Sequence, residues 1–228
     1  MTASGRVIPL RGAQGMIADR MVKSLHEAAQ LTHHATADAS SLVKAKAAAD
    51  AAGTRLSIED LLMARTVRTL LAHPAINGRV EEREIRLSDQ INLGIAISLP
   101  GGLLVAPAIF DAQDMSLAEL RAARRDMAER ARQNKLSVTE MTGGTFTISN
   151  LGLTRVEHFT PIVASPQIAI LGIGRMTEQP VRGETGAVEW RPMVGLSLTF
   201  DHRALNGEPA AAFLTALCET IETDTSWT

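Results

Sequence analysis

The stretch Ser-Leu-Thr-Phe-Asp-His-Arg-Ala-Leu-Asn-Gly at residues 197–207 determines how the rest of the chain is interpreted. Its first part is apolar and β-prone and predicts a strand that ends at Asp201. A short loop then closes on Asn-Gly, before an alanine-rich segment that predicts a helix. His202 would therefore be fixed at a strand end and able to face a cleft, as a general base requires. For an isolated histidine, a surface position in a turn would be the simpler interpretation.

Three blocks of the sequence resemble one family of enzymes. Residues 201–207 resemble the D-H-R-x-x-[D/N]-G signature of dihydrolipoamide acyltransferases, the catalytic cores of 2-oxoacid dehydrogenase complexes. They also resemble the wider H-x-x-x-D-G superfamily that includes chloramphenicol acetyltransferase. Residues 143–152, Gly-Gly-Thr-Phe-Thr-Ile-Ser-Asn-Leu-Gly, and the segments 159–163 and 165–172 are similar to the next blocks of these enzymes. The resemblance covers nearly the whole chain, from about Val7 to about Ile221.

The composition is that of a folded protein. The chain has 228 residues, 45% hydrophobic and 21% charged, which suits one large or two small domains with a sizeable core. The net charge of -2 gives no basic footprint for nucleic acid. Cys218 is the lone cysteine, so an internal disulfide and a cysteine metal cluster are excluded; its apolar position predicts a structural thiol.

The sequence contains no signal for a membrane. No apolar run approaches the roughly 20 residues that span a bilayer, and the first six residues lack the apolar core of a signal peptide. We therefore expect a cytoplasmic enzyme.

Strands and helices mix without strict alternation, which predicts an α+β fold, a two-layer sandwich of a mixed sheet and helices. The resemblance implies the chloramphenicol acetyltransferase-like fold and a homotrimer. Residues 1–12 predict an extended arm, and residues 13–228 one acyltransferase catalytic domain without a lipoyl or subunit-binding domain. Helices are predicted at 13–30, 40–52, between Ser57 and Pro74, after Ser116 and at the C-terminus, and strands at 31–38, 83–88, 91–98, 103–109, 145–149, 168–173, 187–191 and 194–200.

The reaction implied by the resemblance is acyl transfer between coenzyme A and a dihydrolipoyl thiol. A thiol has a pKa near 8.5 and must be activated, which is the role of His202 as general base. The resulting oxyanion needs a preplaced donor, which is the role of Ser149. No metal and no covalent enzyme intermediate are required. Ser149 could instead satisfy the following turn, and Thr145 or Thr147, on the same face of the strand, is then the alternative donor.

Asn206 is a departure from the family pattern, because many members have aspartate there. Asparagine keeps hydrogen-bonding capacity but loses an ion pair, so we expect a supporting role for Asn206, with Arg20 as a candidate partner. Asp201 and Arg203 are expected to hold the loop. His33 and His34 point to opposite faces of a strand, which disfavours a shared metal and leaves one of them free to line a substrate channel.

Partners and alternatives follow from the resemblance. The lipoyl group would be supplied in trans by a separate lipoyl-domain protein, alongside dehydrogenase-complex subunits. The arginines after Ser116 form a solvated face or contact the phosphates of a nucleotide-bearing thiol. Past Ile221 only Trp227 is apolar, which predicts a trimer that builds no larger shell. The alternatives are an alcohol or amine acceptor, or a scaffold without activity; His202 and Ser149 argue against the scaffold.

Overall fold

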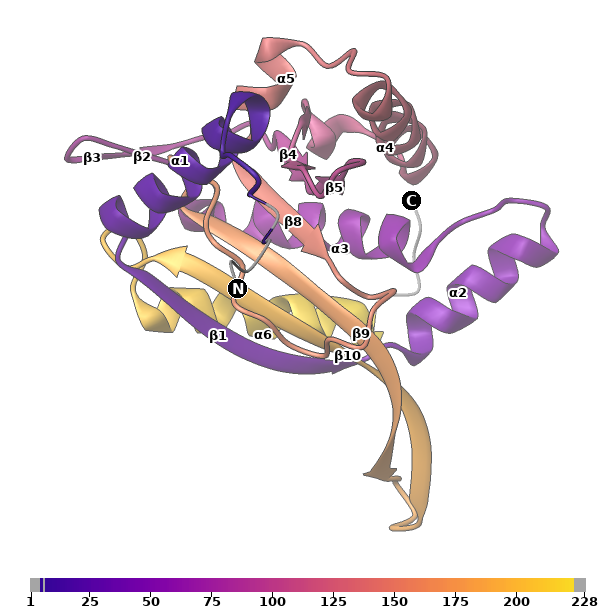
Figure 1. Ribbon diagram of the computed structural model, residues 1–228. Helices are drawn as coiled ribbons and strands as arrows, with labels where there is room; N and C mark the ends of the chain where they lie inside the picture. Colours follow the sequence, from indigo (N-terminus) through magenta and orange to yellow (C-terminus); the bar gives the residue numbers. More distant parts are fainter. Residues whose placement is uncertain (1–4, 6, 224–228) are drawn as a thin grey trace.

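A six-stranded mixed sheet forms the centre of the structure, a computed structural model that describes residue 5 and residues 7–223 (Figure 1). The strands lie in the order β1-β10-β9-β8-β4-β7. β8 is parallel to β4 and to β9, and the other neighbours are antiparallel. Their bounds are Gln30–Asp38 (β1), Leu93–Ile95 (β4), Ala108–Ile109 (β7), Phe146–Asn150 (β8), Ala169–Arg182 (β9) and Val188–Asp201 (β10).

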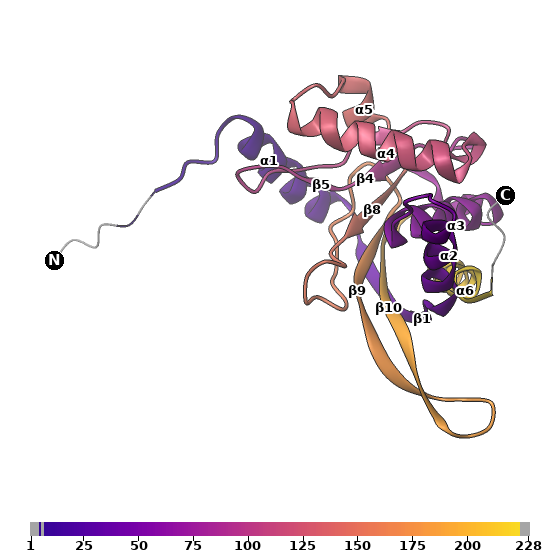
Figure 2. The same cartoon turned by 90° about the vertical axis from the view of Figure 1, so that its right-hand side faces the viewer.

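Helices α2 (Ser40–Ala51), α3 (Ile58–Ala72) and α6 (Gly207–Thr223) cover one face of the sheet (Figure 2). Alternate residues of β10, among them Leu198 and Phe200, are buried in one core with Phe213 of α6. Alternation puts every second strand residue on this face, so the period of two in the sequence becomes the apolar layer. The predicted α+β sandwich of a mixed sheet and helices is confirmed.

The opposite face of the sheet is polar and is covered by α1 (Gly12–Glu27) and by the segment that links β8 to β9. Ser24 Oγ donates to the Val163 carbonyl at 2.6 Å, and the Val163 N–H donates to Gln30 Oε1 at 3.0 Å. Gly172 of β9 lets the Phe159 ring lie directly on the strand, because a Cβ there would come within 2.8 Å of that ring. Hydrogen bonds and one close ring contact therefore hold α1 and the segment between β8 and β9 against this face of the sheet.

Two further helices lie at the end of the sheet near β4 (Figure 1). α4 (Leu117–Arg132) packs against α3 and β7, and the short α5 (Val138–Thr142) contacts β7. The capping boxes predicted at Ser57 and Ser116 are confirmed, since each hydroxyl accepts from the backbone N–H three residues on. A third box at Ser137 begins α5, a helix that the sequence analysis missed.

Several predicted boundaries are wrong. α1 ends at Glu27 and not at residue 30, because Ala28 is extended and Gln30 already pairs with Asp201. The predicted strands 91–98 and 103–109 each divide, so that β5 and β6 form a small sheet of their own. The predicted strand 83–88 is half of a hairpin whose first strand was missed. The bounds are Gly78–Glu81 (β2), Glu84–Leu87 (β3), Ile97–Ser98 (β5) and Leu104–Val105 (β6), with short 3-10 turns at Pro74–Ile76 (η1) and Ala112–Asp114 (η2).

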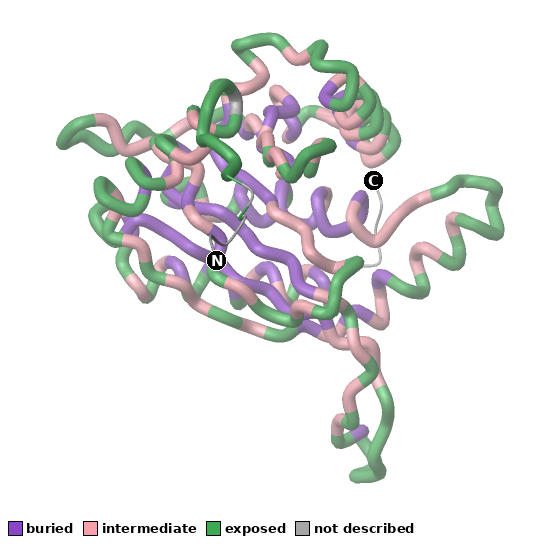
Figure 3. Tube along the Cα trace, viewed as in Figure 1, coloured by how far each residue is buried: buried purple, intermediate pink, exposed green. Residues whose placement is uncertain are grey.

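β9 and β10 form a long hairpin that extends well beyond the rest of the sheet (Figures 1 and 2). The prediction of two separate strands at 187–191 and 194–200 is wrong: β10 runs through Pro192, with a register shift between Val194 and Leu196. The outer half of the hairpin is largely exposed (Figure 3), and the Trp190 side chain is 67% exposed.

Pro107 precedes the edge strand β7, a position that tolerates the missing N–H donor of proline.

Candidate active site

The loop after β10 is anchored through Asp201. Its side chain is 1% exposed, and its Oδ1 accepts from the Ala29 N–H at 3.2 Å and from the Arg203 N–H at 3.0 Å. Arg203 Nη2 donates to Asp201 Oδ2 at 2.6 Å. The backbone N–H of His202 donates to the Ala29 carbonyl at 2.9 Å. Asp201 and Arg203 therefore hold the loop in the way expected from the sequence.

The charge of Asp201 is part of this anchor. Burial alone would raise the pKa of Asp201, but the hydrogen bonds and charge of Arg203 lower it below the ordinary value. The carboxyl group is therefore ionised at neutral pH and acts only as an acceptor, so it is no proton donor for a reaction.

The His202 side chain is exposed beside this anchor. Its ring centroid lies 5.9 Å from that of Phe200, and within the described residues neither ring nitrogen has a hydrogen-bond partner. Asn206 is also exposed, and in the described part of the chain no hydrogen bond joins it to Arg20. Arg20 instead lines a hollow of about 780 Å³ together with Arg203 and Glu27. The imidazole of His202 is thus oriented by its backbone and open to an incoming group.

Ser149 lies at the other candidate position, near the end of β8, and is partly exposed. The two alternative donors are both buried and occupied: Thr147 Oγ1 donates to Gln167 Oε1 at 2.7 Å, and Thr145 Oγ1 accepts from the Asn92 N–H at 3.0 Å. Of the three hydroxyls on this strand face, Ser149 is therefore the one that can still reach a substrate.

Ser149 and His202 lie at opposite ends of the sheet. Ser149 pairs with Gly172, and Gly172 pairs with Ser197, which precedes Asp201 by four residues. Four residues extend about 13 Å along a strand, and two strand spacings add about 10 Å across the sheet. A base and an oxyanion donor must both contact the same few substrate atoms. One chain alone therefore does not bring His202 and Ser149 into one cleft.

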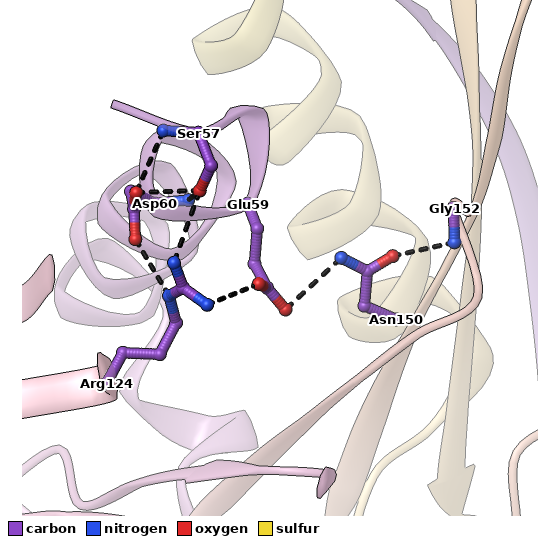
Figure 4. Close-up of polar contacts among 6 residues, drawn as sticks. All are labelled: Ser57, Glu59, Asp60, Arg124, Asn150 and Gly152. Atoms are coloured by element: carbon purple, nitrogen blue, oxygen red, sulfur yellow. Dashed lines mark hydrogen bonds and ion pairs between the residues drawn. The ribbon is translucent and has the colours of Figure 1, made fainter. Parts of the chain in front are cut away.

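Sequence reasoning missed the contacts behind Ser149. The next residue, Asn150, donates to Glu59 of α3, and Glu59 accepts from Arg124 of α4 (Figure 4). Glu59 stands between the two capping residues Ser57 and Asp60, which is the one sequence signal near it. No pattern in the sequence connects three segments that are this far apart.

The adjacent residues His33 and His34 contact different neighbours within the fold. His34 Nδ1 lies 2.9 Å from Ser197 Oγ, whereas the His33 ring packs edge-on to Phe200. The two histidines thus face opposite sides of β1, as predicted.

Burial, aided by neighbouring acidic groups, raises the pKa of Cys218 to about 11. Its thiol is protonated at neutral pH, which fits a structural role.

With this geometry established, known proteins provide the comparison. A sequence model of the family described as 2-oxoacid dehydrogenases acyltransferase (catalytic domain) matches residues 2–228. The chain belongs to this acyltransferase family. A family relative from Bacillus subtilis, the dihydrolipoyllysine-residue acetyltransferase component of the acetoin cleaving system, is 40% identical over 221 residues. The match covers 94% of this chain and 55% of the relative, so the chain spans about half of that relative's length.

Solved structures from the same family agree over nearly the whole chain. A truncated catalytic core of the Thermoplasma acidophilum 2-oxoacid dehydrogenase multienzyme complex is 31% identical with a TM-score of 0.88, covering 97% of this chain and 100% of that one. The dihydrolipoamide acetyltransferase of Azotobacter vinelandii is 31% identical with a TM-score of 0.88, covering 96% and 92%. That structure belongs to a study of a serine, a histidine and an asparagine in the catalytic mechanism of the acetyltransferase.

The predicted fold of the acyltransferase family is confirmed by a more distant structure. Chloramphenicol acetyltransferase is 16% identical with a TM-score of 0.60, over 95% of this chain and 99% of that one. At this identity the likeness concerns the fold alone.

In the part of the chain that the structure describes, no helix is both long and apolar enough to cross a membrane.

Proposed function

We propose that this chain transfers an acyl group between coenzyme A and a dihydrolipoyl thiol, with His202 as general base and Ser149 as oxyanion donor. The observation that carries the proposal is the availability of these two groups in a chain of this family. His202 is exposed on an anchored loop, and Ser149 is the one of three aligned hydroxyls that its own chain leaves accessible. The A. vinelandii study concerns a serine, a histidine and an asparagine, the residue types of Ser149, His202 and Asn206.

The chemistry requires one proton carrier and one oxyanion donor. His202 takes the proton of the attacking thiol, whose pKa near 8.5 would otherwise keep it mostly neutral. The thiolate forms a C–S bond with the thioester carbonyl, and the electron pair moves to the oxygen, where the Ser149 hydroxyl donates to it. Collapse breaks the other C–S bond, and the leaving thiolate takes the proton back from the imidazolium of His202. Asn206 supports the loop and transfers no proton.

The active unit in this proposal is a homotrimer whose clefts lie between subunits. Support comes from the distance between Ser149 and His202 in one chain and from exposed apolar residues on the N-terminal side. Val7 is 89%, Ile8 62% and Leu10 63% exposed, a surface that a partner copy would cover. The sequence adds the expectation of a cytoplasmic location, and the family resemblance adds a lipoyl group supplied in trans and dehydrogenase subunits as partners. The prediction of no larger shell rests on Trp227, which lies outside the described residues.

The test mixes two inactive proteins. In a cyclic trimer each cleft takes its histidine from one chain and its serine from the next. After dissociation and random reassembly of His202→Ala with Ser149→Ala protein, roughly a quarter of the clefts would contain both wild-type groups. We expect that fraction of wild-type turnover with acyl-CoA and free dihydrolipoamide.

Two measurements make the result decisive. Light scattering must first give a mass near three chains of 24.4 kDa each for both variants and the mixture. No recovery in verified mixed trimers would show that the cleft is not shared. If the wild-type protein turned over only with alcohol or amine acceptors, such an acceptor would take the place of the dihydrolipoyl thiol in this proposal.

A further inference from the structure

The backbone that carries Ser149 is tied from behind to two helices. Asn150 Nδ2 donates to Glu59 Oε1 at 3.2 Å, and Arg124 Nη1 donates to Glu59 Oε2 at 2.7 Å (Figure 4). We call these three side chains the Arg124–Glu59–Asn150 bridge. It joins β8, α3 and α4, which are separated by tens of residues in the sequence. The end of β8 is therefore fixed by tertiary contacts, not only by its strand neighbours.

The α4 end of the bridge has a second carboxylate partner. Arg124 Nε donates to Asp60 Oδ1 at 2.8 Å, and the Asp60 side chain is 1% exposed. Asp60 also accepts from the Ser57 backbone N–H at 2.9 Å, within the capping box that begins α3. Burial alone would raise the pKa of Asp60, but its bonds to Arg124 and Ser57 lower it. The guanidinium is thus held by two carboxylates, and charge-assisted bonds of this kind are short and strong.

The β8 end of the bridge shapes the turn after the strand. Asn150 Oδ1 accepts from the Gly152 N–H at 2.7 Å, so one amide group bonds the helix layer and the turn together. Successive strand residues point to opposite faces. Asn150 reaches the face covered by α3, so Ser149 points to the other face, away from the bridge. The anchor therefore orients the strand and leaves the serine hydroxyl unoccupied.

We propose that the Arg124–Glu59–Asn150 bridge is a positioning device that aims the Ser149 hydroxyl at the oxyanion. The inference rests on the proposed function of Ser149. A donor helps only when it already points to the place where charge develops, and a displacement of about 1 Å can cost about 10²-fold in rate. Asn150, Glu59 and Arg124 touch no substrate in this proposal and act through the backbone of β8.

The first variant, Asn150→Asp, breaks one bond and keeps the other. An aspartate oxygen can still accept from the Gly152 N–H, so the turn survives. Its second oxygen faces Glu59 Oε1, and two carboxylates at this distance repel each other. We expect kcat to fall about 10-fold, since part of the positioning is lost, with KM for both substrates changed by less than about 2-fold.

The second variant, Glu59→Gln/Asn150→Asp, reverses the direction of the hydrogen bond. The introduced glutamine would accept from Arg124 through its oxygen and donate to the introduced aspartate through its nitrogen, so the bridge is rebuilt with the same shape. We expect kcat to return to within about 3-fold of wild type. Glu59→Gln alone offers one oxygen to two donors and is expected to lose activity like Asn150→Asp.

A double-mutant cycle separates positioning from general damage. In a Ser149→Ala background the hydroxyl is absent, so Asn150→Asp should change kcat by less than about 2-fold. The matched control is Glu140→Gln, which removes another ion pair of α4, between Arg130 and Glu140, that has no contact with Asn150. We expect thermal unfolding of the control to resemble that of Asn150→Asp while its kcat stays at the wild-type value.

The outcomes divide cleanly. An equal loss from Asn150→Asp with and without Ser149, or no recovery in the double variant despite a wild-type melting temperature, would overturn the bridge. Near-full activity of Ser149→Ala alone would instead overturn the donor role in the proposed function. The activity of this variant is therefore measured before that of any bridge variant. Loss of kcat in the control equal to that of Asn150→Asp would also refute a specific effect.

Discussion

The ends of β8 and β10 position their candidate catalytic groups in the same way but through different contacts. In each case the anchored residue is the sequence neighbour of the reactive one: Asn150 follows Ser149, and Asp201 precedes His202. At β8 the anchor extends through Glu59 to Arg124 on a second helix. At β10 it combines a neighbour in the sequence, Arg203 two residues on, with the backbone of Ala29, which is 172 residues away. Alternation in a strand lets an anchor on one face leave the other face free.

The largest effect tests the group that the β10 end presents. We expect His202→Ala to lower turnover by about 10² to 10⁴, the range for loss of a general base, with the fold intact. Initial rates of acyl transfer to dihydrolipoamide measure the loss, and circular dichroism checks the fold. Because the anchor is Asp201 and not His202, a variant that unfolds would contradict the division between anchor and reactive group.

A smaller effect is expected at the β8 end. Ser149→Ala should lower kcat by about 10² to 10³, the cost of one oxyanion donor, with little change in KM. Saturation kinetics in each substrate separate the two constants. If KM alone changed, the hydroxyl would bind the substrate ground state. Thr147→Val is the matched control, because that hydroxyl lies on the same strand face but bonds Gln167.

The smallest effect concerns the Asp201 anchor and depends on pH. Because the folded pKa of Asp201 is lowered, its contribution to stability is fully present above the unfolded value of 3.8 and is lost as pH falls through the folded value. Asp201→Asn should therefore lower the free energy of unfolding at pH 7 by about 1 to 2 kcal/mol, reduced from the value for buried pairs because Arg203 is partly exposed.

Urea unfolding of wild type and Asp201→Asn, from neutral pH down to about pH 3, tests the sign. The difference in free energy between the two proteins should shrink below 3.8. A constant difference across this range would mean that the ion pair with Arg203 contributes nothing and that the variant acts through shape alone.

Local patterns in the sequence predicted most elements, whereas the two candidate groups were chosen from the family resemblance. Capping boxes at Ser57 and Ser116 were visible because their partners lie three residues away. The same pattern at Ser137 was overlooked, and α5 was missed with it. The two-residue strands β5 and β6 were merged with their neighbours, because two residues carry no periodicity.

Other features depend on sheet order and on distant contacts, which a single sequence does not encode locally. That Ser149 and His202 lie at opposite ends follows from β8 being parallel to β9 and β9 antiparallel to β10. The Arg124–Glu59–Asn150 bridge joins residues 91 positions apart at one step and 65 at the other. The lengths of β9 and β10 were underestimated: β9 continues to Arg182 beyond the predicted strand 168–173, and β10 is continuous across the two predicted strands 187–191 and 194–200.

The position of β1 at the edge of the sheet beside β10 sets an order of events during biosynthesis. Ala29 and Asp201, which meet in the folded chain, are 172 residues apart, so all the residues between them must leave the ribosome before the two can join. Until then β1 lacks its neighbour β10, and the backbone groups that β10 will pair can recruit other nascent chains. Contacts between such distant segments also form slowly. The loop that carries His202 is bonded to the backbone of Ala29, so it reaches its folded position only after this late contact has formed.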